Sequence, residues 1–362
     1  MPPFIKGRVL CERFFLEEAK PILDRFFPGL RYTAGLVGYG SDVLGYDDET
    51  STDHMWGPRF YLFLAPDDFP RKGAVMEAFR SKLPCRYKGY SVNFSAPDPE
   101  DGGVRHPEPV ASGPVDPLIF IHTPEEYLDG YLGCHDFTSL TAVDWLSFSE
   151  HRLLALTAGK FFADDLHLGG KLRALAFYPE DVRLYLLASN WSLAAQEQAF
   201  VRRCADVGDE TGSALAAARI AERLMRLAFL YCRQYAPYSK WFGTAFSRLP
   251  VGEDLKEAIR RAVTAREIGE REDAIVRAQV LAAELHNRCE PRSAVEIRVQ
   301  PYFGRRIKVI FCDRIASALR RRLEGTAFAA YPPVGTLSGI ANFTDLFDDP
   351  ARRESVKGLY RG

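Results

Sequence analysis

The sequence lacks a surplus of either charge. Its 47 Lys and Arg residues against 48 Asp and Glu residues give a formal net charge of −1. Without a global positive field, the chain has no compositional reason to bind nucleic acid or an anionic membrane. It also lacks an apolar run long enough to span a bilayer, and its start lacks the basic flank and apolar stretch of a secretory signal. We therefore expect a cytoplasmic protein that neither crosses a membrane nor binds nucleic acid.

Cysteine is present without a pattern that would give it a structural role. The seven cysteines are scattered, odd in number and never spaced as a CxxC pair. This arrangement supports neither a disulfide framework nor a zinc ribbon. What the chain does have is an ordinary globular composition, with 47% hydrophobic and 26% charged residues. A length of 362 residues favours two domains rather than a single core.

The first part of the chain mixes helical and extended patterns. Residues 8–26 carry apolar side chains at helical spacing, and residues 32–37 form a short apolar run that ends in a glycine-containing turn. Residues 59–65 are apolar on both faces of a strand, so we expect them in the centre of a sheet. Other segments predict helices at 67–83 and 124–132 and strands at 87–94 and 118–122.

The second part is helical in pattern almost throughout, from residue 141 to residue 286. These patterns predict an α+β protein, in which a small mixed-sheet domain precedes an all-α helical bundle. We place the first domain at 1–139 and the bundle at 140–300. Residues 301–362 are expected to form a C-terminal extension that packs on the other domains.

One turn and the residues after it have the character of a nucleotide site. Gly40 and Ser41 follow a predicted strand, where backbone N–H groups and a hydroxyl can hold a phosphate. Asp53 stands just before the next strand, and a carboxylate at such an edge is a ligand that Mg²⁺ takes in nucleotidyl transfer. His54 is a candidate base or ligand, with a structural hydrogen-bonding role as the alternative. Arg59 can bind phosphate as a fork, or pair with the acids between residues 47 and 53.

A second candidate segment covers residues 235–246 in the helical part. Lys240 lies among Tyr235, Tyr238, Trp241 and Phe242. Aromatic rings with one cation suit the stacking of a base or the binding of a phosphate. The alternative is a packing joint of the bundle in which Lys240 extends its ammonium group to water. We predict Tyr238 and Lys240 as nucleotide-binding residues. The acidic run 47–49 is expected to be a solvated loop face.

Two segments carry a resemblance to a known family. Residues 38–47 read GYGSDVLGYD, and residues 51–59 read STDHMWGPR. Both are similar to the N-terminal signature of an uncharacterised bacterial and fungal family of nucleotidyltransferase-like proteins. Other stretches are also similar to that family, so that the resemblance covers nearly the whole chain: 93–95, 144–146, 156–159, 178–179, 208–210 and 235–246.

The resemblance implies a polymerase-β-like nucleotidyltransferase domain followed by a helical domain. This architecture is that of antibiotic nucleotidyltransferases, which transfer AMP to small hydroxylated acceptors. Active members of the wider superfamily have two carboxylates one residue apart and a third on a neighbouring strand. Here Met55 stands at the second position and Phe120 at the third, and neither offers the hard oxygen ligand that Mg²⁺ requires. Asp116, just before that strand, is the nearest substitute.

Three hypotheses follow from the sequence. The leading one is an enzyme that binds Mg²⁺ with ATP or another NTP and transfers a nucleotidyl group to a small-molecule acceptor. The alternative is a catalytically altered or inactive nucleotidyltransferase fold that binds a nucleotide or metabolite in a biosynthetic or regulatory role. The third is a protein-interaction module that uses the helical bundle. In the leading scheme Asp53 is the metal ligand, Asp53 and His54 are catalytic, and Gly40, Ser41, Arg59, Tyr238 and Lys240 bind the nucleotide.

Overall fold

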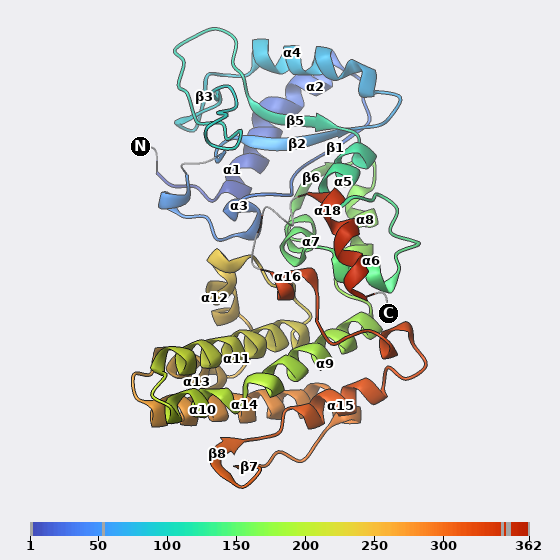
Figure 1. Ribbon diagram of the computed structural model, residues 1–362. Coiled ribbons are helices and arrows are strands. Elements are labelled where there is room, and N and C mark those ends of the chain that lie inside the picture. Colours follow the sequence, from blue (N-terminus) through green and yellow to red (C-terminus); the bar gives the residue numbers. More distant parts are fainter. Residues whose placement is uncertain (1–2, 53–54, 342–343, 345–348, 361–362) are drawn as a thin grey trace. The chain divides into compact units, whose positions relative to one another are not determined.

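A computed structural model describes residues 3–52, 55–341, 344 and 349–360. The chain forms two compact units (Figure 1). The first contains residues 1–139 and 152–176, and the second contains residues 140–151 and 177–362. The fold is α+β, as predicted, with a small mixed sheet in the first unit and a large set of helices in the second. None of the helices in the described part of the chain is long and apolar enough to cross a membrane.

The first unit is built on a four-stranded sheet with the order β5-β2-β1-β6. Its strands are β1 (Tyr32–Leu36), β2 (Arg59–Leu64), β5 (Leu118–His122) and β6 (Lys160–Asp164). β1 runs antiparallel to β2 and β6, whereas β2 and β5 are parallel. All six residues of β2 are buried, which confirms its predicted central place.

Side chains of β2 alternate between two apolar layers. Phe60, Leu62 and Leu64 face a core built with the N-terminal helices and α4 (Lys72–Lys82). The N-terminal helix is continuous over α1 (Gly7–Phe14), a π-helical turn (Phe15–Ala19) and α2 (Lys20–Phe26). The other face is aromatic: the rings of Tyr61 and Phe63 contact Tyr127 of α5 (Pro124–Leu132).

Short elements complete the first unit. They are α3 (Ser41–Leu44), α8 (Leu168–Leu172), the 3₁₀ turns Glu49–Ser51, Phe69–Arg71 and Arg173–Leu175, and the hairpin of β3 (Arg86–Tyr87) and β4 (Tyr90–Ser91).

The sequence interpretation of this unit needs two corrections. The strand predicted at 87–94 is instead the short β3–β4 hairpin, because Lys88 and Gly89 both have positive φ and turn the chain. The stretch predicted to be helical from residue 141 contains β6, whose five residues pair with β1. α7 (Glu150–Thr157) ends just before that strand.

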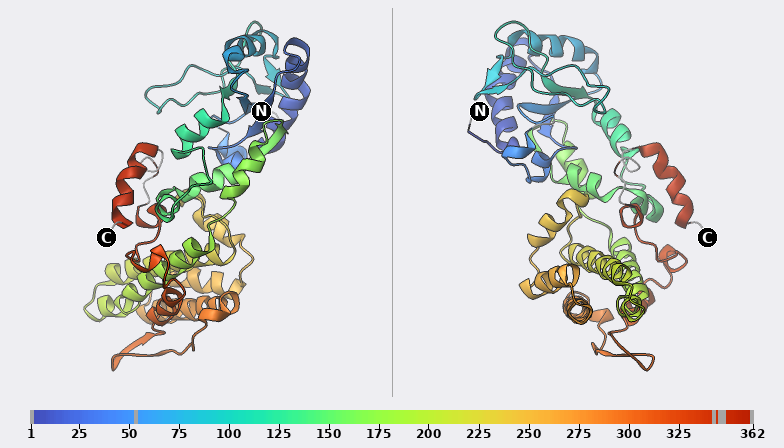
Figure 2. Two further views of the ribbon diagram at one scale, coloured as in Figure 1. Left: turned by 90° about the vertical axis from the view of Figure 1, so that its right-hand side faces the viewer. Right: turned by 60° about the vertical axis from the view of Figure 1, so that its left-hand side comes forward.

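The second unit is a helical bundle around α11 (Glu210–Tyr231), with a hairpin that extends from the helices (Figure 2). α11 packs against α9, α10, α13 and α14, and its buried residues Ala217, Ala221, Leu224 and Ala228 follow the helical period. The other elements are α6 (Ala142–Ser147), α9 (Glu180–Glu197), α10 (Phe200–Asp206), α12 (Ser239–Ser247), α13 (Glu253–Thr264), α14 (Ile268–Cys289), α15 (Asp313–Arg321), α16 (Leu337–Ile340), α18 (Pro350–Val356), the 3₁₀ turns Pro291–Ser293, Ala327–Ala329 and Lys357–Tyr360, and the hairpin of β7 (Gln300–Tyr302) and β8 (Arg305–Val309).

Candidate functional site

The turn after β1 requires glycine at two positions. Gly38 has φ 82° and Gly40 has φ 114°, a region that L-residues with a side chain rarely adopt. Packing adds a second constraint, because a Cβ atom at Gly38 would lie 2.4 Å from the Tyr127 hydroxyl. A Cβ atom at Gly40 would lie 2.2 Å from a carboxylate oxygen of Asp42. The Tyr127 hydroxyl and the Asp42 carboxylate therefore leave no room for a side chain at Gly38 and Gly40.

A buried ion pair lies directly beneath the turn. The Arg59 and Asp42 side chains are only 1% and 2% exposed, and Arg59 Nη2 donates to Asp42 Oδ1 at 2.8 Å. The same nitrogen donates to the Tyr39 carbonyl at 2.9 Å, and the guanidinium carbon lies 4.4 Å from the centre of the Tyr39 ring. Burial alone would lower the pKa of Arg59, but the charge of Asp42 raises it above the ordinary value. Arg59 is thus a permanent cation held by Asp42, an acid outside the stretch 47–53 in which the sequence suggested a partner.

Three buried donors around this turn have no hydrogen-bond partner among the described residues. They are Arg59 Nη1 and the hydroxyls of Tyr39 and Tyr127. Burial raises the pKa of both tyrosines, so their hydroxyls keep their protons. Buried polar groups are almost always paired, and an exception calls for a water, an ion or a ligand. The surroundings of the turn therefore hold donors in excess of acceptors.

The acids near the turn already have partners. Asp47, predicted to face solvent, is buried, because its carboxylate accepts the Gly7 amide at 2.6 Å and the Trp56 indole N–H at 3.3 Å. Asp116 accepts from Arg105 at 2.6 Å and from Arg80 at 3.0 Å.

The positions at which the sequence resemblance implies carboxylates carry other side chains. Phe120 pairs with Tyr61 in the β2–β5 register, and their rings stack at 4.9 Å. Met55 has a positive φ of 45°. Asp53 and His54 lie outside the described residues. Within the part of the chain that the structure describes, no three His, Cys, Asp or Glu side chains form a metal site. A three-carboxylate magnesium site does not fit these side chains.

Lys240 and Tyr238, the two residues predicted in the second segment, lie in different environments. Lys240 is exposed at the start of α12, with its ammonium group 5.2 Å from the Trp241 ring centre. Tyr238 is half-buried, and its ring contacts that of His151. Tyr238 also lines a pocket within the second unit, whereas Lys240 does not.

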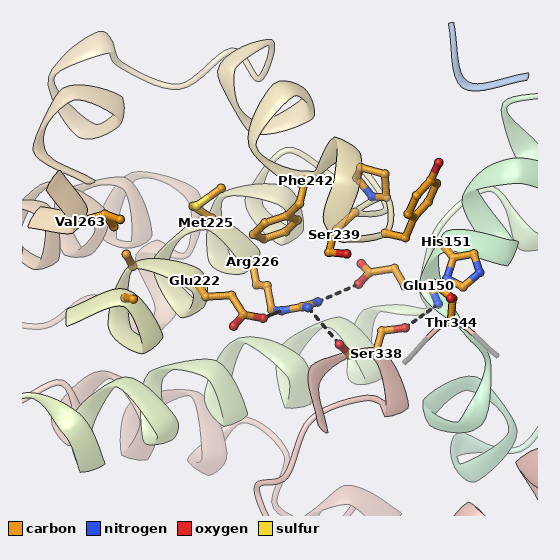
Figure 3. A pocket seen from close by; sticks show the side chains of 15 residues that line it. Glu150, His151, Glu222, Met225, Arg226, Ser239, Phe242, Val263, Ser338 and Thr344 are labelled. Atoms are coloured by element: carbon orange, nitrogen blue, oxygen red, sulfur yellow. Dashed lines mark hydrogen bonds and ion pairs between the residues drawn. The ribbon is translucent and has the colours of Figure 1, made fainter. Parts of the chain in front are cut away.

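That pocket has a volume of about 310 Å³ and contains a charge cluster, in which Glu150 is buried and Arg226 and Glu222 are partly exposed (Figure 3). Arg226 lies between two acids: its Nε donates to Glu222 at 3.0 Å, and its Nη1 donates to Glu150 at 3.4 Å. Its Nη2 donates to the Ser338 carbonyl at 2.9 Å, and the Ser338 hydroxyl accepts the Glu150 amide at 2.9 Å. Burial raises the pKa of Glu150, although Arg226 and the Ala236 amide act against it. No pattern in the sequence indicated this cluster.

Comparison with known proteins gives a match to one family model and a distant structural similarity. The model of a family described as a domain of unknown function (DUF4037) matches residues 145–242, a segment that includes Glu150, Glu222 and Arg226. No curated protein matches the chain. Among solved structures, the chain is similar to a nucleotidyltransferase-like protein from Exiguobacterium sibiricum 255-15, with 10% sequence identity and a TM-score of 0.32. That similarity covers 79% of this chain and 82% of the other.

Proposed function

We propose that the protein binds a nucleotide, such as ATP, through the turn at residues 38–41. In this proposal Arg59 and the Tyr39 and Tyr127 hydroxyls donate hydrogen bonds to its phosphates. The observation that carries the proposal is the set of three buried donors without acceptors around one glycine-dependent turn. Phosphate oxygens are acceptors only, and guanidinium groups bind them with particular strength.

The charged guanidinium and the protonated hydroxyls can all donate hydrogen bonds to an anion. Asp42 neutralises one edge of the Arg59 guanidinium, while Nη1 remains available. The Gly40 backbone and the Ser41 hydroxyl are the other groups that we assign to the phosphates. Since the three donors are shielded from water, we expect binding to require a side-chain movement at the turn, and such rotamer changes are common on binding.

We further propose that nucleotide binding does not lead to two-metal transfer. Phe120 occupies the strand position of the third carboxylate, and Asp116 is engaged by two arginines. Asp53 is then the residue that we assign to a Mg²⁺ ion accompanying the nucleotide. A clamp of carboxylates on two metals is what stabilises the attacking and leaving oxygens in such chemistry, and these side chains do not build it.

Calorimetric titration with ATP tests the binding site. Tyr39→Phe removes one orphan hydroxyl and keeps the ring over Arg59, so we expect ATP affinity to fall about tenfold. Tyr178→Phe is the matched control, because the Tyr178 hydroxyl is also buried without a partner but belongs to the second unit. Both variants lose an uncompensated hydroxyl and should be at least as stable as the natural chain. Absence of ATP binding by the natural chain, or equal affinity in Tyr39→Phe, would refute the proposed site.

Two further measurements test the metal and the reaction. Asp53→Ala should abolish any strengthening of ATP binding by Mg²⁺ while leaving metal-free binding intact. Pyrophosphate release from ATP should be absent both alone and with small hydroxylated acceptors. If pyrophosphate appears and Asp53→Ala abolishes it, transfer by Asp53 and His54 replaces the proposal of binding without transfer.

A further inference from the structure

The pocket of the second unit has two chemically distinct ends (Figure 3). One end is apolar and is formed by α11, α12 and α13, through Ala218, Met225, Phe242 and Val263. The other end is polar. Its side chains are Glu150, His151, Glu222, Arg226 and Ser239. Pockets of a few hundred Å³ with an apolar wall and a few converging polar groups are typical of small-molecule sites.

The two acids of the pocket have more hydrogen-bond acceptor positions than the neighbouring groups fill. Each carboxylate offers about four acceptor positions. Glu150 receives Arg226 Nη1 and the Ala236 amide, and Glu222 receives Arg226 Nε. Most acceptor positions of the two acids therefore remain unfilled within the described residues.

The two arginines nearby already donate to acceptors. Arg226 directs its three nitrogens at Glu222, Glu150 and the Ser338 carbonyl. Arg223 donates to the Gly339 carbonyl with both terminal nitrogens at 3.1 Å, and it lines a separate small cavity rather than this pocket. The wall of the pocket thus contains two carboxylates, one guanidinium and the His151 imidazole. Because the acids outnumber the arginine, a ligand that completes the pocket has to bring donors and positive charge.

We infer that this pocket binds a small organic amine, with its ammonium group at Glu150 and its hydrocarbon part against Met225 and Phe242. An anionic ligand is disfavoured, because it would face two carboxylates while the guanidinium is already shared between them. A neutral alcohol of the same shape would leave the charge of the wall uncompensated. The inference concerns the second unit alone and does not depend on nucleotide binding.

Titration with 2-phenylethylamine, in the absence of nucleotide, tests this inference. 2-Phenylethanol and 3-phenylpropionate serve as the neutral and anionic counterparts of the same size. We expect the amine to bind at least about tenfold more tightly than the alcohol, and the acid not to bind. No binding of the amine, or equal binding of amine and alcohol, would overturn the inference.

Variants locate the binding and guard against misfolding. Glu150→Gln keeps the shape of the side chain and should weaken amine binding about tenfold. Ala218→Phe fills the apolar end of the pocket without changing its charged residues and should abolish amine binding. This second variant tests the inference even if Glu150→Gln does not fold. Glu253→Gln is the control, because Glu253 has an 85% exposed side chain, and it should bind the amine like the natural chain.

The two proposals fail independently. Tyr39→Phe should bind the amine normally, and Ala218→Phe should bind ATP normally. If Ala218→Phe binds the amine as tightly as the natural chain does, the amine lies elsewhere and the assignment of this pocket is wrong.

Discussion

Each unit pairs an arginine with acids, but the polar groups around the two arginines differ. Arg59 has one acid, Asp42, and the donors around it outnumber the acceptors. Arg226 has two acids, Glu150 and Glu222, and the acceptors around it outnumber the donors. The first unit therefore has a neutral pair with hydrogen-bond donors left over, whereas the second has one more acid than arginine in its cluster.

The comparison indicates that the polar groups around a paired arginine, rather than the arginine itself, determine which ligand the site would bind. A buried pair is costly to break and contributes little net stability when intact. What the pair leaves unsatisfied is then the chemically informative part. On that reasoning the turn would take an anion and the pocket a cation.

Breaking the pair in the first unit should have the largest effect. Arg59→Met leaves the Asp42 carboxylate buried without its cation, and we expect a loss of about 3–5 kcal/mol in the free energy of unfolding. Urea denaturation followed by tryptophan fluorescence measures this loss. Arg71→Met is the matched control, because the Arg71–Asp68 pair is partly exposed, at 41% and 20%, and should cost under about 1 kcal/mol. Equal losses in the two variants would show that the Arg59 pair is not effectively buried.

The corresponding change in the second unit should cost less. Arg226→Met removes hydrogen bonds to two carboxylates, which is worth about 1.5–3 kcal/mol. The loss is limited because the pKa of Glu150 is already raised by burial, so that this acid can take up a proton when its cation is gone. Unfolding at pH 5 and pH 8 measures the effect, with the larger loss expected at pH 8. A loss at pH 8 greater than that of Arg59→Met would reverse the comparison.

The pH dependence of stability isolates Glu150 itself. A carboxyl with a raised folded-state pKa binds more protons in the folded state than in the unfolded state, so stability falls as pH rises from the ordinary pKa of glutamate to the raised one. Glu150→Gln lacks this contribution. The stability of the natural chain relative to Glu150→Gln should therefore decline with rising pH in that interval, by no more than about 1.4 kcal/mol per pH unit. A relative stability that increases with pH would mean that Arg226 outweighs burial.

The local part of the first unit could be predicted from its sequence. β1, β2 and β5 were predicted from runs of apolar residues bounded by glycine and proline. Such predictions succeed because the length of a strand and the alternation of its side chains depend on residues close together in the sequence. β6 was missed, since only five residues lie between helical patterns and their partner is β1, more than a hundred residues earlier. No local pattern distinguishes such a strand from the end of a helix.

The chemistry of both sites was less predictable for the same reason. Asp42 follows Ser41 directly within the quoted segment, yet its role depends on Arg59, 17 residues away on another element. Glu150 and Arg226 are 76 residues apart. Sequence reasoning identified the turn through its glycines, whereas the acids that pair with arginines became visible only from the tertiary fold.

The smallest expected effect concerns Met55, beside the predicted metal ligand. Its φ of 45° lies in the left-handed region, which costs a residue with a side chain about 1–2 kcal/mol. Met55→Gly should therefore stabilise the chain by about 0.5–1 kcal/mol, the remainder being offset by the greater freedom of glycine in the unfolded state. Met76→Gly, within α4, is the control and should destabilise by more than about 1 kcal/mol, because glycine is unfavourable inside a helix and Met76 packs against the core. Destabilisation by both variants would indicate that packing of the Met55 side chain outweighs its backbone strain, and would give the thioether a structural reason to stand where the sequence resemblance implies an acid.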